Sequence, residues 1–479
     1  MKNDYGKLLF MMGFLFLIPL TVIIFVPEEK HFAAAFLLPA AISFVLGGII
    51  GQIRPAGNGG WESLMEKGSR PVLFIWGYAF LIGAIPFVVA HQLGPIQALF
   101  ESVSGWTTTG LTVSNVTIMP WIFLFYRSFM QYCGGLGFVI MITMVSHGKQ
   151  SFSIYSAEGH AETFRPSLRD TARVITTLYV AWLAAGVVLY VICGMPAPDA
   201  VCHTMSALST AGFSTRAESI AAYSGTLIRL ITILLMLVGA SNFAVILQLC
   251  KGRFRLAFRE SEFKFMLGVT VVFSVLIAAE HFFGGEGSVG SCLVNALFAV
   301  VTTFTTTGYS LTDYSVWPAA SLGLLWVLMI IGGCSGSTAG GIKMYRAYLL
   351  GRSLILYLRR NMEPASWEPA SYYIHQQEMV TITGKTKERL TGFLTLYLAT
   401  MVAGTILLAL AAGCPLSEAF FEFTSALGTV GLSCGLTSPD LPAAALILEM
   451  IGMVLGRLEI TIVIIGVLNF IRRIVNRFE

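Results

Sequence analysis

Four short strings rich in Ser, Thr and Gly contain residue types that could bind a cation. They are SGWTTTGLT, SALSTAGFS, TTFTTTGYS and SALGTVGLS, and they centre on Gly110, Gly212, Gly308 and Gly431. Each string has threonine two positions before its glycine, an apolar residue directly after it and a hydroxyl residue two positions after it. Such a match within one chain indicates an internal repeat.

The chemistry that these loops offer is cation binding by backbone carbonyl groups. A ring of carbonyl oxygens can replace the hydration shell of a monovalent cation, and glycine at φ > 0 lets successive carbonyls turn toward one axis. Strings of small residues could instead only pack helices closely in lipid, but four strings in register disfavour that alternative. The predicted filter residues are Thr108, Thr109, Gly110, Thr210, Ala211, Gly212, Thr306, Thr307, Gly308, Thr429, Val430 and Gly431.

Composition places these loops in a membrane. Of 479 residues, 56% are hydrophobic and 12% charged, whereas soluble domains carry roughly 25% charged residues. A spanning helix needs about 20 apolar residues. Ten stretches qualify: 8–26, 33–53, 71–90, 120–146, 171–194, 226–250, 265–283, 317–350, 388–412 and 442–471. Four others, 96–109, 199–211, 291–307 and 417–430, are too short to cross and precede the glycines, so we expect re-entrant pore helices.

The charge distribution sets the orientation. Most of the 30 Lys and Arg residues fall in segments that are cytoplasmic if both termini are cytoplasmic, which puts all four pore helices on the outer face. We therefore predict an all-α integral membrane protein with four parallel span–pore-helix–span repeats around a central ion pore. Two extra transmembrane helices occupy 1–60, and the repeats occupy 61–165, 166–258, 259–385 and 386–479.

The second span of the third repeat is predicted to break. Five glycines lie between Gly332 and Gly341, and each interior glycine destabilises a helix by about 1 kcal/mol relative to alanine. The break would lie below the third filter loop, across the inner half of the pore. The alternative is a flexible helix whose glycines serve only packing.

Ionisable residues within apolar segments are the other candidates for function. Glu101, His203 and Glu422 share one repeat position, nine residues before the glycine, which Ala299 occupies in the third repeat. They could anchor the filter loops through hydrogen bonds or raise the local affinity for cations, and we favour anchoring. Arg127 is near the outer end of its span, where its side chain could reach the membrane surface, and a structural role is expected.

Several stretches together resemble the Trk/Ktr superfamily of potassium transporters, and most closely the TrkH/TrkG type, which has two extra N-terminal spans. The resemblance extends over essentially the whole chain. Its motifs are FESVSGWTTTG (100–110), RSFMQYCGGLGFVI (127–140), HTMSALSTAGFSTR (203–216), TTFTTTGYS (302–310), GGCSGSTAGGIK (332–343), FEFTSALGTVGLS (421–433) and LGRLEI (455–460).

The resemblance implies a mechanism in which the broken span is an intramembrane gate. Arg457 would face the pore inside the filter and contact the gate, although it could instead pair with Glu449 or Glu459. The gating residues would be Gly332, Gly333, Ser335, Gly336, Ser337, Thr338, Gly340, Gly341, Lys343 and Arg457.

It also implies potassium as the transported ion, a homodimer with one pore per protomer, and cytosolic TrkA-like nucleotide-binding regulatory subunits. The protein would lie in the bacterial inner membrane and contact lipid. No nucleic acid partner is expected. The motifs of a membrane-embedded enzyme are missing from the sequence, and neither an enzyme nor an organic cofactor is expected. Each loop has one glycine rather than TVGYG, which suggests looser selectivity; a sodium-permeable or cation-coupled carrier of the same superfamily is the alternative.

Overall fold

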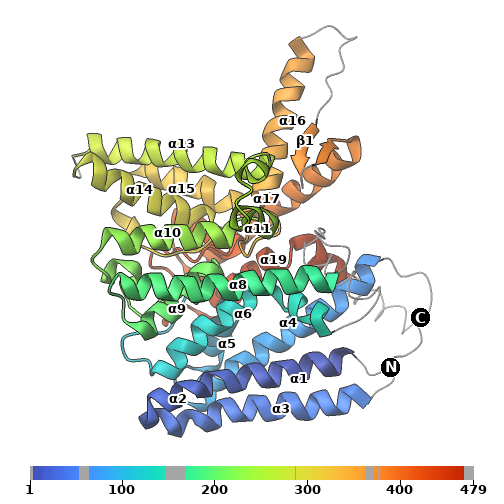
Figure 1. Ribbon diagram of the computed structural model, residues 1–479, viewed down its shortest axis with the longest axis vertical. Helices are drawn as coiled ribbons and strands as arrows, with labels where there is room; N and C mark the ends of the chain where they lie inside the picture. The colour runs from blue at the N-terminus through green and yellow to red at the C-terminus, as the bar shows by residue number, and fades with distance from the viewer. Residues whose placement is uncertain are drawn as a thin grey trace.

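The chain folds into a bundle of α-helices that run largely side by side (Figure 1). The computed structural model describes residues 4–52, 64–145, 168–285, 287–362, 372–375 and 378–468. The predicted boundaries near 60 and 165, and both chain ends, lie outside these residues.

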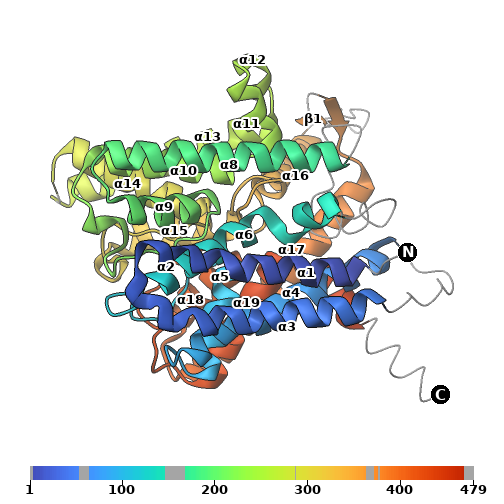
Figure 2. The same cartoon turned by 60° about the horizontal axis from the view of Figure 1, so that its bottom comes forward.

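A helical hairpin precedes the repeats. Helix α1 (Asp4–Leu17) continues through η1 (Ile18–Thr21) and α2 (Val22–Phe25), and η2 (Pro27–Phe32) leads into α3 (Ala33–Gln52). Figures 1 and 2 show α1 and α3 side by side at one edge of the bundle. The ring of Phe44 packs against those of Phe10 and Phe14, with centroids 5.8 and 5.1 Å apart. The two extra N-terminal helices are thus confirmed.

Each repeat consists of a long helix, a short pore helix and a second helix. The long helices are α4 (Leu64–Val89), α8 (Leu168–Ile192), α13 (Ser261–Phe283) and α17 (Gly384–Ala412). The pore helices are α5 (Pro95–Trp106), α9 (Ala197–Leu208), α14 (Val289–Phe304) and α18 (Leu416–Gly428). The second helices are α6 (Trp121–Val145), α10 (Thr226–Ala240), α15 (Ala319–Ile331) and α19 (Ala443–Arg457). This order confirms the predicted repeat architecture.

The pore helices begin where the sequence provides a start signal. Pro95 is the first residue of α5, and Pro196 and Pro415 are the N-caps of α9 and α18. Proline fits there because its missing N–H would lack an intrahelical partner anyway. Each pore helix ends two or three residues before its predicted end, because the last residues turn into the glycine loop. The C-terminal halves of these helices are almost completely buried.

The sequence predicts ten spans of which one, 317–350, is broken, whereas the structure interrupts the second helix of every repeat. Among the described residues, six helices are long and apolar enough to cross a membrane, and a seventh counts if a pair bent by 105°, Ala443–Arg457 with Ile460–Leu468, is one span. The difference arises in the second helices of the repeats. All four are interrupted partway, so that few unbroken segments reach spanning length.

A further group of elements, which we call the additional layer, lies outside the four sets of repeat helices just given. It comprises α11 (Phe243–Cys250), α12 (Phe254–Ala257), α16 (Met344–Met362) and a hairpin of β1 (Tyr372–His375) and β2 (Glu378–Thr381). The strands are antiparallel, and Tyr373 pairs with Val380. A cluster of Leu349, Tyr373, Ile382 and Leu390 packs the hairpin against α16 and α17. The sequence did not predict this hairpin.

Candidate ion filter and gate

The four glycine loops share one unusual backbone conformation. The glycines have φ of 91°, 76°, 77° and 86°, and the threonines two positions earlier have φ of 56°, 52°, 56° and 50°. Left-handed backbone destabilises an L-residue by roughly 1–2 kcal/mol. Its recurrence at four threonines means that the surrounding structure imposes it. The four residues are Thr108, Thr210, Thr306 and Thr429, which we call the filter threonines.

The loops pack against one another in a closed ring. Each glycine faces the carbonyl oxygen of the residue that precedes the glycine in the next repeat, so closely that an added Cβ would overlap it. These contacts join Gly110 to Ala211, Gly212 to Thr307, Gly308 to Val430 and Gly431 to Thr109. The fourth contact returns to the first repeat. The structure therefore brings all twelve predicted filter residues together.

Backbone hydrogen bonds shape every loop in the same way. The residue before the glycine donates its N–H to the carbonyl of the residue five positions earlier in the pore helix. The N···O distances are 3.0 Å for Thr109 to Ser104, 3.0 Å for Ala211 to Ser206, 2.9 Å for Thr307 to Thr302 and 2.8 Å for Val430 to Ser425. The sequence spacing that the four repeats share thus produces the same backbone turn in each loop.

Gln131 on α6 also holds the filter, and sequence reasoning missed it. Its Nε2 donates to the carbonyl of Ala211 at 2.7 Å, while its Oε1 accepts from Ser206 Oγ at 2.6 Å and from the N–H of Phe213 at 3.1 Å. The side chain is fully buried. The only signal in the sequence was an amide within an otherwise apolar stretch next to the Gly134–Gly135 pair.

The three predicted support residues all contact the segment that follows the filter glycine. Glu101 accepts from Thr112 Oγ1 at 3.0 Å and from the N–H of Val113 at 3.3 Å. His203 hydrogen-bonds Ser214 Oγ at 3.0 Å. The carboxylate of Glu422 accepts from Ser433 Oγ and from the N–H groups of Leu436 and Thr437 at 3.1 and 3.2 Å. These bonds are the ones that loop anchoring requires.

Repeat 3 has Ala299 at this position and is held differently. The hydroxyl of Tyr309, directly after Gly308, donates to the carbonyl of His203 at 3.1 Å. The N–H of Ser310 donates to Ser219 Oγ at 3.3 Å. Loop 3 therefore relies on contacts with repeat 2 instead of a carboxylate on its own pore helix.

Arg127 lies inside the protein rather than reaching the surface. Its side chain is 1% exposed, its Nε lies 2.5 Å from a carboxylate oxygen of Glu101, and its guanidinium lies 4.0 Å from the ring centre of Phe213. It also donates to Thr112 Oγ1 at 2.8 Å. Arg127 thus joins the loops of repeats 1 and 2.

An ionic contact also fixes the outer loop of repeat 2. Asp199 accepts from Thr215 Oγ1 at 2.6 Å and from Arg216 Nη2 at 2.9 Å. Burial raises the pKa of Asp199, but the hydrogen bonds from Thr215 and Arg216 lower it by more, so that the net pKa lies below its ordinary value. This contribution to stability is therefore present at neutral pH and is lost only as the pH falls through that lowered pKa.

The predicted break in the third repeat forms a loop, residues 332–343, directly beneath the filter. Helix α15 ends at Ile331, Gly332 has φ 73°, and α16 begins at Met344. We call these residues the gating loop. Thr338 Oγ1 lies 3.0 Å from Thr210 Oγ1, and the N–H of Gly340 donates to Thr306 Oγ1 at 2.9 Å. Gly340 also packs against Thr429 so closely that a Cβ would overlap it. Three of the four filter threonines thus contact the loop.

Other bonds attach the gating loop to the broken second helix of repeat 2. The N–H of Cys334 donates to the carbonyl of Ala240 at 2.9 Å, and that of Thr338 to Gly239 at 3.1 Å. The carbonyl of Gly336 accepts from the N–H of Phe243 at 3.3 Å.

Further bonds lie within the gating loop or between the loop and its flanking residues. Ser337 Oγ donates to the carbonyl of Cys334 at 2.6 Å, and Lys343 donates to that of Ala339. Gly333 accepts from the N–H of Met344 at 2.8 Å, and Gly332 and Gly341 pack against each other.

Arg457 links the gating loop to two other repeats. From the end of α19, its Nη1 donates to the carbonyl of Thr338 at 2.7 Å and its Nη2 to that of Gly134 on α6 at 2.5 Å. Glu459 forms its ion pair with Arg346 at 3.0 Å. The guanidinium thus contacts the loop, as the motif comparison implied.

Breaks occur in all four second helices, although the sequence analysis predicted only one. Gly137 interrupts α6 with φ 68°, Ser241 and Asn242 separate α10 from α11, and Glu459 has φ 58° at the bend after α19. The gating loop is the fourth break. Counted from the filter glycine of the same repeat, the four breaks begin 24 to 29 residues further along the chain. The residues at the other three breaks are weaker signals for a helix end than five glycines, and the sequence did not predict these breaks.

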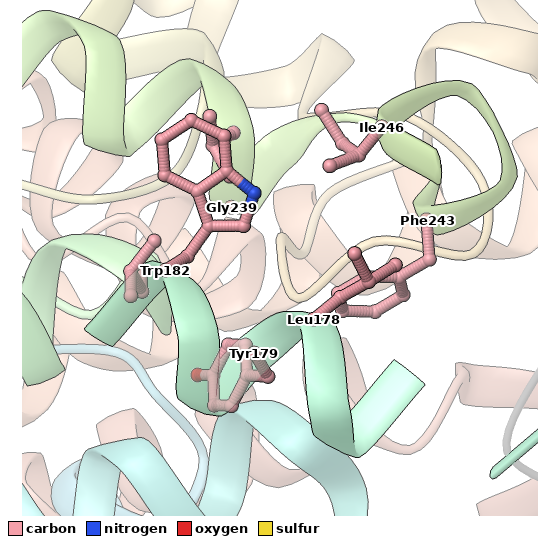
Figure 3. A pocket seen from close by; sticks show the side chains of 8 residues that line it. Leu178, Tyr179, Trp182, Gly239, Phe243 and Ile246 are labelled. Atoms are coloured by element: carbon pink, nitrogen blue, oxygen red, sulfur yellow. The ribbon is translucent and has the colours of Figure 1, made fainter. Parts of the chain in front are cut away.

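A small cavity lies behind the attachment of the gating loop (Figure 3). Its volume is about 10 Å³, near the minimum for one water molecule. Gly239 and Leu208, whose carbonyls accept from Thr338, are among the lining residues. The others are Leu178, Tyr179, Trp182, Val238, Phe243 and Ile246. Its apolar walls provide packing space rather than an ion site.

Comparison with known proteins agrees with this geometry. Residues 63–470 match the family model TrkH, described as cation transport protein. The chain is 28% identical to the Trk system potassium uptake protein TrkG of Escherichia coli, over 96% of each chain. It is also 28% identical to an uncharacterized cation transporter of Methanocaldococcus jannaschii, over 96% of this chain and 93% of the relative. The crystal structure of the potassium transporter TrkH from Vibrio parahaemolyticus superposes with a TM-score of 0.84 at 26% identity, over 96% of each chain.

Proposed function

Since the chain belongs to the TrkH family of cation transport proteins, we propose that it takes up potassium ions through a pore at the centre of its four repeats. The family consists of multi-pass membrane transporters and not of enzymes. The relatives named as potassium uptake proteins favour potassium as the ion.

The closed ring of glycine loops is the observation that carries this proposal. Four loops with the same left-handed backbone surround one axis, and no Cβ fits between them. The filter residues would present their backbone carbonyls to a dehydrated cation. Among the described residues, no cluster of His, Cys, Asp or Glu could hold a metal ion through side chains. We infer selectivity at the backbone oxygens from the ring geometry of the four loops.

The gating loop supports the second part of the proposal, which is control of flux. Its contacts with three filter threonines support a position across the inner exit of the ring. Arg457 would hold it there through the carbonyl of Thr338 and would repel cations from the path. The loop would open by moving away from the filter, and its glycines would permit the second conformation.

We further propose the setting in which this transporter works. It would be a homodimer in the bacterial inner membrane, with both termini in the cytoplasm. A soluble TrkA-like nucleotide-binding subunit would control the gate from the cytosol. The end of the bundle that contains α11 and α12 exposes Lys251, Arg253, Arg255 and Arg259 and offers a basic surface for that partner.

Flux into liposomes tests the transport proposal. The purified chain, reconstituted alone and with its regulatory subunit, should take up rubidium, a tracer for potassium, much faster than sodium or lithium. Equal uptake of all three ions would contradict potassium selectivity and favour the sodium-permeable alternative. Uptake that requires an opposing or accompanying gradient of protons or sodium would indicate a coupled carrier.

A further inference from the structure

A carboxylate on α13 contacts the gating loop and the start of the helix that follows it. Glu262 is the second residue of α13 and is 8% exposed. Its Oε1 accepts from the N–H of Ser335 at 2.7 Å, within the loop, and from the N–H of Tyr345 at 2.9 Å, in the first turn of α16. One oxygen atom therefore joins a residue inside the loop to the first turn of the helix that follows the loop.

The chemistry of this contact makes it strong. Backbone N–H groups that donate to a carboxylate form charge-assisted hydrogen bonds, which are about twice as strong as neutral ones. Tyr345 lies in the first turn of α16, where N–H groups have no intrahelical acceptor and the helix dipole favours a negative charge. The low exposure of Glu262 limits competition from water, so that both donors would be left unsatisfied without it.

A second contact on the same helix reinforces this position. One turn after Glu262, Met266 lies with its sulfur 3.6 Å from Cys334 Sγ. Cys334 is 2% exposed. The first two turns of α13 thus hold consecutive loop residues, Cys334 by packing and Ser335 by hydrogen bonding. Loop movement away from the filter requires both contacts to break.

The start of α13 is also the point where the additional layer meets the loop. Ser261 Oγ accepts from the N–H of Ile374 in strand β1 at 3.0 Å. The ring of Tyr345 packs at a tilt against that of Tyr373 in the same strand, with ring centroids 5.8 Å apart. The exposed basic residues in and around α12, from Lys251 to Arg259, precede Ser261 in the chain. A movement of this layer, such as one caused by a bound partner, would therefore shift the residues that hold the loop.

We propose that Glu262 is a positioning residue that holds the gating loop beneath the filter and connects it to the cytoplasmic layer. This inference rests on the proposed role of residues 332–343 as a gate. Loss of the carboxylate would release Ser335 and the start of α16 while leaving the filter ring, and hence ion selectivity, unchanged. Glutamine keeps one carbonyl oxygen that can accept from the same N–H groups, so it should preserve much of the effect.

The natural thiol of Cys334 reports loop release without any transport measurement. In the full chain, purified or reconstituted, N-ethylmaleimide labelling is followed at each cysteine by peptide mass spectrometry. Glu262→Ala should raise the labelling rate of Cys334 about tenfold to a hundredfold, since two charge-assisted bonds are lost. Glu262→Gln should raise it less. Glu388→Ala, which removes an exposed carboxylate from α17, should leave it unchanged.

Two buried thiols elsewhere, Cys133 and Cys202, separate loop release from general unfolding. Both should stay protected in Glu262→Ala. The inference is overturned if Cys334 stays as protected as in the unaltered chain, or if all three thiols become reactive together. Rubidium flux measured in parallel should rise without a partner, with unchanged selectivity. Absence of flux in the unaltered chain with its partner would contradict the proposed function, whereas the labelling result would still decide the role of Glu262.

Discussion

At the scale of single residues, the filter depends on glycines at positions where a side chain does not fit. The glycines combine φ values of 76° to 91° with direct contact to a neighbouring carbonyl oxygen. Any side chain would therefore meet both a conformational and a steric barrier. The buried polar residues Gln131, Glu101 and Arg127 have a different role, because they supply hydrogen bonds to loop backbone that water cannot reach.

Replacement of a filter glycine should damage selectivity more than folding. Gly110→Ser and Gly212→Ser each place a Cβ against the next loop and strain the backbone by about 1–3 kcal/mol, enough to lower potassium uptake or its selectivity roughly tenfold. Rubidium and sodium uptake, with protein level on a blot, measure the effect. Gly77→Ser is the control, since open space surrounds that helical glycine. Normal affinity and discrimination in both filter variants would rule out the filter assignment.

The buried pair of Arg127 and Glu101 should matter more than the partly exposed pair of Arg216 and Asp199. Arg127→Ala leaves a carboxylate buried without its cation, which should destabilise the protein by about 3–5 kcal/mol. Arg216 is 49% exposed, and Arg216→Ala should destabilise the protein by less, because water can take the place of the guanidinium while Thr215 still donates to Asp199. Thermal unfolding in detergent compares the two variants. Equal shifts in melting temperature would show that Arg127 does not hold the loops.

At the scale of elements, the recurring feature is a helix that stops inside the membrane. Each second helix is interrupted after its filter loop, and the interruption in repeat 3 is long enough to form a separate loop. Backbone that leaves a helix at this depth must find other partners. Here the partners are the carbonyls of Gly239 and Ala240, the hydroxyl of Thr306 and the side chains of Glu262 and Arg457.

Loss of the gating loop should open the pore. Deletion of residues 334–338, or Arg457→Ala, removes the contacts that hold the loop under the filter, so that basal rubidium flux should rise and depend less on the regulatory subunit. Selectivity should be retained because the filter ring is unchanged. Flux assays with and without the subunit provide the measurement. A well-folded deletion variant with low, partner-dependent flux would place the constriction elsewhere along the pore.

At the scale of the whole molecule, four sequential units form one closed ring. Contacts between neighbouring filter loops run from repeat 1 to 2, 2 to 3, 3 to 4 and back to 1. The N-terminal hairpin lies to one side of this assembly (Figures 1 and 2), while α16 and the β hairpin project from it (Figure 1). In the proposed orientation, the segments after the filter glycines face outward, whereas the basic residues from Lys251 to Arg259 face the cytoplasm.

Thiol labelling should reveal this polarity directly. Asn115→Cys puts a thiol at an exposed position just after the first filter loop, whereas the natural Cys250 is exposed at the end of α11. In intact cells stripped of their outer membrane, an impermeant reagent should label position 115 and not Cys250. Inverted vesicles should give the opposite pattern. Labelling of position 115 only from the cytoplasmic side would refute the arrangement.

The basic surface should determine partner binding. Replacement of Lys251, Arg253, Arg255 and Arg259 together by glutamine removes four exposed charges, so affinity for the nucleotide-binding subunit should fall and become less dependent on salt. Co-purification at two salt concentrations measures this. Replacement of Lys385, Lys387 and Arg389, exposed on α17, is the matched control. Nucleotide-regulated flux by the purified chain alone would contradict the need for a partner.

The sequence by itself determined the membrane class, the four repeats, the pore helices and the position of the gating loop. Hydrophobic length, positive charge and an internal repeat are local or periodic properties, which do not depend on distant contacts. Five glycines in ten residues likewise end a helix in almost any surroundings.

Only the tertiary structure decided which groups hold these parts together. Left-handed threonines have no sequence signal, because the neighbouring loops impose their conformation. The partners of Gln131 and Glu262 lie 73 to 83 residues away from them along the chain, and nothing in the local pattern indicates such pairs. The milder breaks in the other second helices follow from packing around the ring. Long-range contacts, not composition, thus turn four similar segments into a filter with one gate.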